Sequence, residues 1–324
     1  MLSRVAEKLY WMTRYMERAE DTSRLINAVT LMILDIPGEA SFGWDSLIKI
    51  AGLDELFFEH YPEANEASVM RFLIQDERNP SSIMTCIAHA RENTRTFREI
   101  LPWESWEWVN ELYLYAKENL DGELGRRQRY DVLQGIIRRR QSIVGLLSGT
   151  MSRDAAFQFL RIGRNVERAD MTSRILDVSH AVILPEDTPA GAQYADLLWM
   201  NILKALSAYQ MYRRHVSVHA RSEEVVNFLL RDTMFPRTVA HCLTEIDEVL
   251  KILPRSGPAL AAVQKAQGIL ANAHGGLSKE GLHEFIDQLQ VGLSEIDAAL
   301  RESFFRVPEI EPISSMSQRV ESAA

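Results

Sequence analysis

The sequence predicts an all-α protein: a helical bundle built from two tandem copies of a helical unit of roughly 150 residues. Apolar residues recur at helical spacing along nearly the whole chain, and no Asn-Gly or Asp-Gly hairpin turn joins two runs of alternating polarity. A charged eleven-residue motif also occurs twice, 150 residues apart. The periodicity predicts the fold class, and the repeated motif predicts the tandem organisation.

Twelve helices are expected, and residues that stop or reverse a helix separate most of them. In order, the expected helices cover residues 3–35, 44–58, 65–77, 81–100, 103–120, 122–148, 152–182, 191–219, 222–232, 236–252, 257–273 and 279–305. The breaks fall at Pro37-Gly38, Pro62, Asn79-Pro80, Pro102, Pro185 to Gly191, Pro236, Pro254 to Pro258 and Gly275-Gly276. Residues 307–324 contain two prolines, several serines and no helical period, so a flexible tail is expected there.

The repeated motif is the strongest internal similarity in the chain. It reads Arg14-x-x-Glu17-Arg18-Ala19-x-x-Thr22-Ser23-Arg24, then Arg164-x-x-Glu167-Arg168-Ala169-x-x-Thr172-Ser173-Arg174, with seven of eleven positions identical. Further matches, such as Cys86 with Cys242, follow at an offset of about 156 residues, which requires only small loop insertions. We therefore predict one unit at residues 1–150 and a second at 151–306, packed about a pseudo-twofold axis. Whether they form one bundle or two lobes stays open.

Composition and charge limit the function classes. A chain of 324 residues with 46% hydrophobic and 25% charged residues is ordinary for a globular protein. Its net charge of −9 argues against a nucleic-acid partner, which would need many cations facing phosphates. The one basic cluster comprises Arg126, Arg127, Arg129, Arg138, Arg139 and Arg140. At about 100° per residue these six side chains point all round one helix, which favours a solvated surface.

The two cysteines and the lengths of the apolar runs indicate in which cellular compartment the protein is expected. Cys86 and Cys242 lie at equivalent places on apolar helices, where free cysteine behaves as a small core residue. The N-terminal segment lacks the uninterrupted apolar stretch of a signal peptide, and runs such as 259–263 are too short to span a bilayer. We therefore expect a cytoplasmic protein with no membrane association.

The repeated motif gathers charge on one helix face. Arg14, Glu17, Arg18, Asp21 and Arg24 fall within about 120° of one another, and Met12, Tyr15, Ala19 and Ile26 lie opposite, towards the core. Local pairs are possible from Glu17 to Arg14 and from Asp21 to Arg18 or Arg24. The second copy keeps Arg164, Glu167, Arg168 and Arg174 but has Met171 in place of Asp21. Arg174 is therefore expected to find its acceptor elsewhere.

Three interpretations of this charged element compete. In the first, the element is a solvated face with weak local ion pairs. In the second, the two copies meet at the interface between the repeats and form a buried, mutually satisfied network. In the third, the element binds an anion. In the last case Glu17 and Glu167 are the candidate catalytic residues, acting as general base, and the arginines at 14, 18, 24, 164, 168 and 174 bind a carboxylate or phosphate.

A second polar segment adds candidate binding residues. Arg91, Glu92 and Asn93 belong to a helix on which Arg91 and Arg95 share one face, and Trp106 and Asn110 follow. The equivalent stretch of the second copy keeps little of this pattern. A solvated face is the favoured interpretation of the segment.

Other motifs are weaker. His215 and His219 are spaced for a metal edge, but no third ligand is identifiable, so no metal is predicted. Trp103, Trp106, Trp108, Tyr113 and Tyr115 are typical of helix packing, although a peptide groove is an alternative. The sequence has no GxGxxG, Walker, GxSxG or Cys/His catalytic pattern, and no cofactor is predicted.

Several blocks resemble the bacterial alpha-E domain family, which is named for its helices and its Glu-Arg (ER) motif. The opening block, Leu2-Ser3-Arg4-Val5-Ala6-Glu7-x-Leu9-Tyr10-Trp11-Met12-x-Arg14-Tyr15-x-Glu17-Arg18-Ala19-Glu20, is highly specific. The other blocks are Ala90-Arg91-Glu92-Asn93, Trp106-Glu107-x-x-Asn110, Glu167-Arg168-Ala169-Asp170 and Phe235-Pro236-Arg237. Thr238 stands where serine is commoner in the family, and the resemblance runs from residue 1 to about 305.

The resemblance implies an all-helical protein encoded beside, or fused to, a circularly permuted ATP-grasp ligase and a transglutaminase-like protein. That context suggests a system that makes or trims amide bonds on peptides. The leading hypothesis is a non-catalytic helical partner or peptide-binding component of such a system. The alternatives are an enzyme of amide chemistry that uses the Glu-Arg motifs, and a purely structural homo-oligomer.

Overall fold

The computed structural model describes residues 3–35, 43–181, 189–272 and 279–306, and within these ranges the chain is helical and contains no strand. The all-α prediction is therefore confirmed. Two long helices dominate, α1 (Ser3–Asp35) and α8 (Ala155–Ala181), and they carry the two copies of the charged motif. None of the described helices is both long enough and apolar enough to pass through a bilayer.

The other elements are shorter. They are α2 (Asp45–Ala51), α3 (Asp54–Phe58), α4 (Glu66–Ile74), α5 (Ile83–Thr96), α6 (Trp103–Asn119), α7 (Arg126–Thr150), α9 (Pro189–Ala205), α10 (Tyr209–His215), α11 (Ser222–Arg231), α12 (Val239–Ile252), α13 (Gly257–Asn272) and α14 (Lys279–Leu300), and a π-helical turn at Arg301–Phe305 follows. Most predicted helices agree with these within a few residues.

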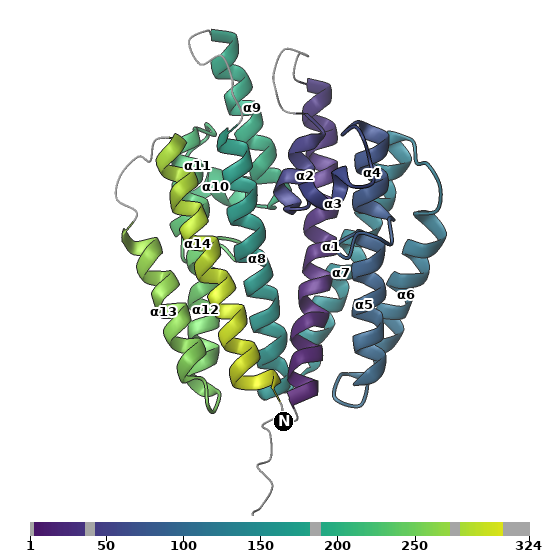
Figure 1. Cartoon of the computed structure of the whole chain (residues 1–324), viewed down its shortest axis with the longest axis vertical. Coiled ribbons are helices and arrows are strands. Elements are labelled where there is room, and N and C mark those ends of the chain that lie inside the picture. Colours follow the sequence, from purple (N-terminus) through teal and green to yellow (C-terminus); the bar gives the residue numbers. More distant parts are fainter. Residues whose placement is uncertain (1–2, 36–42, 182–188, 273–278, 307–324) are drawn as a thin grey trace, which may run out of the picture.

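Helices α1 and α8 lie side by side in the middle of the molecule (Figure 1). In the first half, α5 and α7 pack against α1, and α6 packs outside them against both. In the second half, α12 and α14 pack against α8, and α13 packs outside them against both. One continuous hydrophobic core, which includes Met12, Ile136, Leu176 and Ile246, runs through both halves.

Two of the predicted helices are each divided in the structure. The predicted helix 44–58 is interrupted at Gly52, whose φ of 65° gives α2 a left-handed cap that few other residues adopt without strain. The predicted helix 191–219 is interrupted at Ser207, where φ is 56° and the chain reverses before α10. The breaks expected near Pro37, Pro185 and Gly275 and the tail at 307–324 lie outside the described residues.

The starts of α5 and α12 use the same local chemistry. Ser82 caps α5 by accepting a hydrogen bond from the Thr85 backbone N–H, and Thr238 caps α12 in the same way for His241. Cys86 and Cys242 follow in the first turn of these helices, both buried and unbonded to each other, as expected of core cysteines. Burial raises the pKa of each thiol to about 12, which makes them poor nucleophiles.

Close contact of α1 with α8 depends on a glycine. A Cβ atom on Gly163 would lie far inside van der Waals contact of the Tyr10 backbone oxygen and of Thr13 Oγ1. The Tyr10 oxygen belongs to the α1 backbone, so only movement of a whole helix could relieve the clash. Gly163 therefore sets how near the two charged motifs approach each other.

We predict that Gly163→Ala destabilises the protein by about 1–3 kcal/mol because it overpacks the α1–α8 contact. The matched control is Gly268→Ala, at an exposed position of α13 where an added Cβ would meet no atom within 4 Å. That control should stabilise the protein slightly, because alanine is the better helix former. Urea unfolding of both variants measures the difference, and equal effects would contradict the packing argument.

Candidate functional site

Glu167 of α8 is held by two arginines of α1. Arg14 donates from Nε to Oε2 at 2.7 Å, and Arg18 donates from Nε to Oε1 at 2.5 Å and from Nη2 to Oε2 at 3.0 Å. The Glu167 side chain is 1% exposed. Arg14 also donates from Nη1 to Asp297 at 3.0 Å and to the hydroxyl oxygen of Tyr10. The carboxylate of the second motif is thus enclosed by the arginines of the first.

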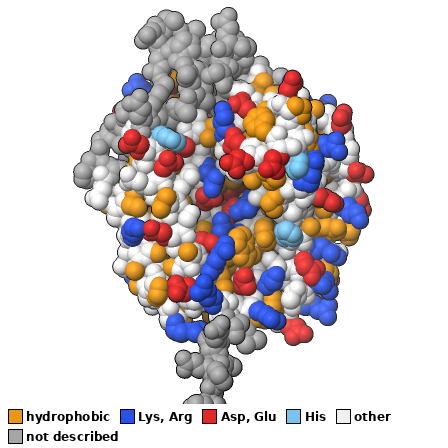
Figure 2. Space-filling view, in the orientation of Figure 1, with side chains coloured by type: hydrophobic (Ala, Val, Ile, Leu, Met, Phe, Trp, Pro, Cys, Tyr) orange, Lys and Arg blue, Asp and Glu red, His pale blue; other side chains and the backbone are white. Residues whose placement is uncertain are grey.

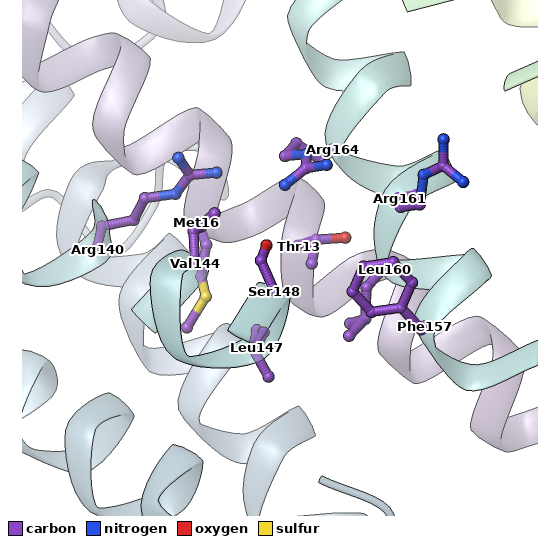
Figure 3. A pocket seen from close by; sticks show the side chains of 10 residues that line it. All are labelled: Thr13, Met16, Arg140, Val144, Leu147, Ser148, Phe157, Leu160, Arg161 and Arg164. Atoms are coloured by element: carbon purple, nitrogen blue, oxygen red, sulfur yellow. The ribbon is translucent and has the colours of Figure 1, made fainter. Parts of the chain in front are cut away.

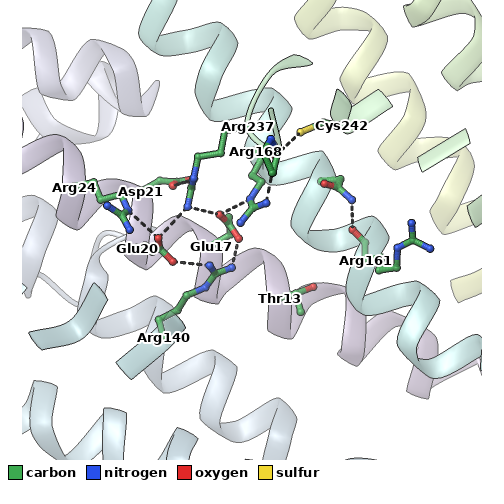
Figure 4. A network of polar contacts seen from close by, with 12 residues as sticks. Thr13, Glu17, Glu20, Asp21, Arg24, Arg140, Arg161, Arg168, Arg237 and Cys242 are labelled. Carbon is green, nitrogen blue, oxygen red and sulfur yellow. Dashed lines mark hydrogen bonds and ion pairs between the residues drawn. The ribbon is translucent and has the colours of Figure 1, made fainter. Parts of the chain in front are cut away.

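Glu17 of α1 makes the reciprocal contact. Its Oε1 accepts from Arg168 Nε at 2.7 Å, and it is also paired with Arg140 of α7 and with Arg237 of the turn before α12. Figure 4 shows the three guanidinium groups converging on this fully buried carboxylate. The expected meeting of the two motifs in a buried network is therefore confirmed, and two further arginines take part.

The network continues one turn along α1. Glu20 accepts from Arg24 Nε at 2.8 Å, from Arg237 Nη2 at 2.9 Å and from Arg140 Nη1 at 2.5 Å. Asp21 pairs with Arg237 through Oδ1, while its buried Oδ2 has no hydrogen-bond partner among the described residues. We call this set of side chains the ER network; its members are Glu17, Glu20, Asp21, Glu167, Arg14, Arg18, Arg24, Arg140, Arg168 and Arg237.

The electrostatics favour ionised glutamates. Burial alone would raise the pKa of Glu167, but Arg18 and Arg14 outweigh it and hold the pKa at about 2. The pKa of Glu17 is likewise held well below its usual range, because its three arginines outweigh burial. A carboxylate with so low a pKa, and with its oxygens already accepting from guanidinium groups, is a weak general base.

Several predicted local pairs are wrong. Glu17 does not bind Arg14 on its own helix, and Asp21 does not bind Arg18 or Arg24. These arginines instead reach across to α8 or back to Glu20, because a buried carboxylate that lacks a charged partner is costly. Arg174 was expected to find a distant acceptor, yet it donates from Nε to Asp170 on its own helix at 2.9 Å.

Three members of the ER network were not predicted from the sequence: Glu20, Arg140 and Arg237. Glu20 appeared only as part of the opening family block. Arg140 was assigned to a solvated basic helix, but its side chain is 3% exposed, and Arg129 is also buried and bound to Glu66. Ile136 and Ile143 flank Arg140 at helical spacing, and this apolar stripe was the available signal. Arg237 lay in a recognised family block without an assigned role, and only the fold brings it to α1.

Arg164 differs from its counterpart Arg14. Its buried Nε has no hydrogen-bond partner, and no ion pair holds its guanidinium among the described residues. Burial, with the charge of Arg168 beside it, lowers the pKa of Arg164 to about 10. Of the six predicted motif arginines, it alone lacks an acceptor within that part of the chain.

The Arg91 segment forms a separate contact between α5 and α6. Arg91 is half-buried, donates from Nε to Asn110 at 2.7 Å, and lies against the rings of Trp106 and Tyr113. Asn93 is buried, whereas Glu92 is exposed and pairs with Arg95. No hydrogen bond or ion pair among the described residues joins this segment to the ER network, so the two sets of predicted binding residues do not form one site.

The structure also places the tryptophans and histidines that the sequence analysis named as weaker candidate site residues. Trp103 and Trp108 are exposed on α6, so the expectation that they pack in the core is wrong for these two. His215 ends α10 and His219 lies beyond it, so the pair does not share a helix face. A different trio, Asp177, His283 and Asp287, has ligand atoms within 4.8 Å of one another at the surface, where His283 is already bound to Asp177.

On the face of the molecule shown in Figure 2, charged side chains gather along the hollowed middle, over the seam between α1 and α8. The glutamates themselves are not reachable there, because Glu17 and Glu167 are buried. At the seam only the edges of the arginines reach the surface. The side chain of Arg18 is 20% exposed and that of Arg24 is 14% exposed.

The fold and the site define an all-helical protein organised around two Glu-Arg helices that neutralise each other. Comparison with protein families gives the same answer. Residues 1–305 match the model of the Alpha-E family, described as a predicted alpha-helical domain with a conserved ER motif, and the chain belongs to that family. No curated protein and no solved structure matches the chain.

The raised pKa of Asp21 predicts how the stability of the protein changes with pH. Burial raises its pKa to about 7, with Arg237 opposing and Glu17 and Glu20 reinforcing the rise. A folded-state pKa above the unfolded value gives stability that is fully present below about pH 4 and is lost as the pH rises through 7. The difference in unfolding free energy between wild type and Asp21→Asn should therefore shrink between pH 5 and pH 8. A difference that grows over this range would show that Arg237 dominates instead.

Proposed function

We propose that this Alpha-E protein is a non-catalytic helical partner in a system that forms or modifies peptide amide bonds. The observation that supports this role is the state of the two motif glutamates. Both are buried, both have low pKa values, and both are bound by arginines of the opposite helix. The two motif glutamates thus join two helices, and all four of their carboxylate oxygens already accept from guanidinium groups.

The two halves form the rigid scaffold of this partner. We infer that they arose by duplication, because the motif helices, the Ser82 and Thr238 caps and the paired cysteines recur at nearly constant offsets. The packing of α5, α6 and α7 around α1 also matches that of α12, α13 and α14 around α8. A duplicated unit whose apolar helix faces meet its sister buries surface that neither unit could bury alone.

The exposed surface of α6 around Trp103 and Trp108 is the docking surface in this proposal. Trp103 is 69% exposed and Trp108 is 37% exposed. Tryptophan and arginine are the residues that most often dominate the binding energy of protein interfaces. Arg91, ordered by Trp106 and Asn110 beside this face, adds a pre-positioned cation.

A hollow of about 760 Å³ also lies beside α6. It lies between α6 and the first turns of α7 and is lined by Tyr115, Asn119, Arg127 and Arg138, among others. Broad and shallow, it suits a segment of another protein better than a small molecule. The partner that the family context suggests is the circularly permuted ATP-grasp ligase, with the transglutaminase-like protein as a further component.

We predict that the chain co-purifies with its ATP-grasp ligase and that Trp103→Ser with Trp108→Ser weakens binding at least tenfold. The reason is the loss of two exposed aromatic side chains from α6. Because both side chains lie at the surface, the variant should fold normally. The matched control is Ile252→Ser, an exposed apolar residue at the end of α12 in the other half.

Binding is measured by surface plasmon resonance and ligation by a coupled ATPase assay with and without this chain. Two outcomes would contradict the proposal: no association, or ligation that proceeds unchanged when the chain is omitted. Self-association of the chain through the two tryptophans, detected by light scattering, would instead favour a homo-oligomer.

A further inference from the structure

An enclosed cavity beside the ER network and a polar cluster at the surface differ in what they can admit. Figure 3 shows the cavity between α1, α7 and α8, where Arg140 and Arg164 lie beside apolar side chains. Its volume of about 20 Å³ matches a single water molecule, so no organic ligand fits there. The surface cluster consists of Asp177, His283 and Asp287, and it is open to an ion from solvent.

The surface cluster joins α8 to α14. Asp177 lies one turn before the end of α8, and His283 and Asp287 lie one turn apart on α14. Each of the three offers a ligand atom, and these atoms lie within 4.8 Å of one another. The side chains of His283 and Asp287 are 62% and 60% exposed, whereas that of Asp177 is 20% exposed. The imidazole ring is therefore held by α8 on one side and reached from solvent on the other.

The hydrogen bond to Asp177 determines which ring nitrogen of His283 is free. Nδ1 lies 2.7 Å from Asp177 Oδ1. An ionised carboxylate only accepts hydrogen bonds, so Nδ1 carries the proton and the neutral ring presents a lone pair at Nε2. Histidines that bind metal ions are commonly oriented in this way, by a carboxylate that accepts from the nitrogen opposite the ion.

The free nitrogen of His283 faces a second carboxylate, and 3.7 Å separates Nε2 from Asp287 Oδ2. This gap is too long for a hydrogen bond, in which the nitrogen and oxygen lie about 2.7–3.2 Å apart. A metal ion with bonds of about 2.0–2.2 Å to both atoms spans the gap at an angle of about 120°, which is close to tetrahedral. The spacing of the two acceptors therefore suits a bridging metal ion better than a bridging proton.

The charge around the ring favours a cation. The hydrogen bond to Asp177 raises the pKa of His283, and the negative charges of Asp177, Asp287 and Glu284 act in the same direction. Among the described residues, His283 is the only ion-pair partner of Asp177 and of Asp287. Their carboxylates are thus not neutralised by a lysine or arginine of that part of the chain.

The types of ligand atom select the class of ion. An imidazole nitrogen combined with a carboxylate oxygen suits Zn²⁺ and other divalent transition metals. Mg²⁺ and Ca²⁺ prefer oxygen ligands alone. Because the cluster is exposed, water fills the remaining coordination positions of the ion.

We propose that His283 Nε2 and Asp287 bind a divalent transition-metal ion of the zinc class at the surface of α14, with Asp177 of α8 as the residue that positions the ring. The site belongs to the second half of the chain, so it does not depend on the docking surface proposed at α6.

The test uses the full-length protein without a histidine tag, since such a tag binds the same metals. Zinc chloride is titrated at pH 7.5 and followed by calorimetry and by NMR of ¹³C-labelled histidine rings. The ring signals of His283 should shift saturably, and His283→Gln should remove this binding event. Asp287→Asn, which keeps the shape but removes the charge, should weaken binding at least about tenfold. The matched control is His215→Ala, an exposed histidine at the end of α10, and it should leave the affinity unchanged.

Two variants test the positioning role of Asp177. Asp177→Ala should weaken Zn²⁺ binding about tenfold, because the ring loses the acceptor that orients it. Asp177→Asn keeps a carbonyl acceptor for Nδ1–H and should bind within about threefold of wild type. The proposal would be overturned if the His283 signals do not respond to Zn²⁺, if His283→Gln binds as well as wild type, or if Mg²⁺ displaces Zn²⁺ at equal concentration. Equal losses in Asp177→Asn and Asp177→Ala, or light scattering that shows the ion joining two chains, would also overturn it.

Discussion

Pairing of buried carboxylates with arginines across α1 and α8 is the interaction on which this structure depends. A glutamate removed from water is tolerated only where opposite charges and hydrogen bonds replace the solvent. Glu167 obtains them from Arg14 and Arg18, and Glu17 obtains them from Arg168 and from helices further out. This demand explains the position of Gly163, which lets the two backbones come close, and of the Arg237 turn, which must return to α1 after two thirds of the chain.

The sequence could predict the fold because helical period and breaking residues are local properties. It placed α1, α6 and α11 almost as the structure has them. It failed at Gly52 and Ser207, where a single left-handed residue divides an otherwise continuous apolar period. The site was harder, because the partners of a buried charge are set by tertiary contacts. The motif predicted that Glu17 and Glu167 belong together, but helical spacing favoured pairs within one helix, and the structure made pairs between helices.

Arg140 shows that the number of arginines in a segment does not reveal which of them are buried. It stands in a run of three arginines, two of which face outward, and only its apolar neighbours Ile136 and Ile143 distinguish it. Once it binds Glu17 and Glu20, the two motifs cease to be electrostatically equal. Arg14 keeps its acceptors and Arg164 loses the one that symmetry would provide. The network that joins the two helices thus leaves the Nε of Arg164 without a hydrogen-bond acceptor among the described residues.

The most direct test of this account is a double-mutant cycle between Arg18 and Glu167, whose side chains join the two helices through two hydrogen bonds. The variants Arg18→Met, Glu167→Leu and their combination are unfolded in urea at pH 7. Glu167→Leu should cost about 3–5 kcal/mol because Arg14 and Arg18 lose their shared carboxylate, and Arg18→Met should cost less because Glu167 keeps its bond to Arg14. The combination should cost at least about 2 kcal/mol less than the sum of the two. Additive costs would show that the two motifs do not depend on each other, which would contradict the account.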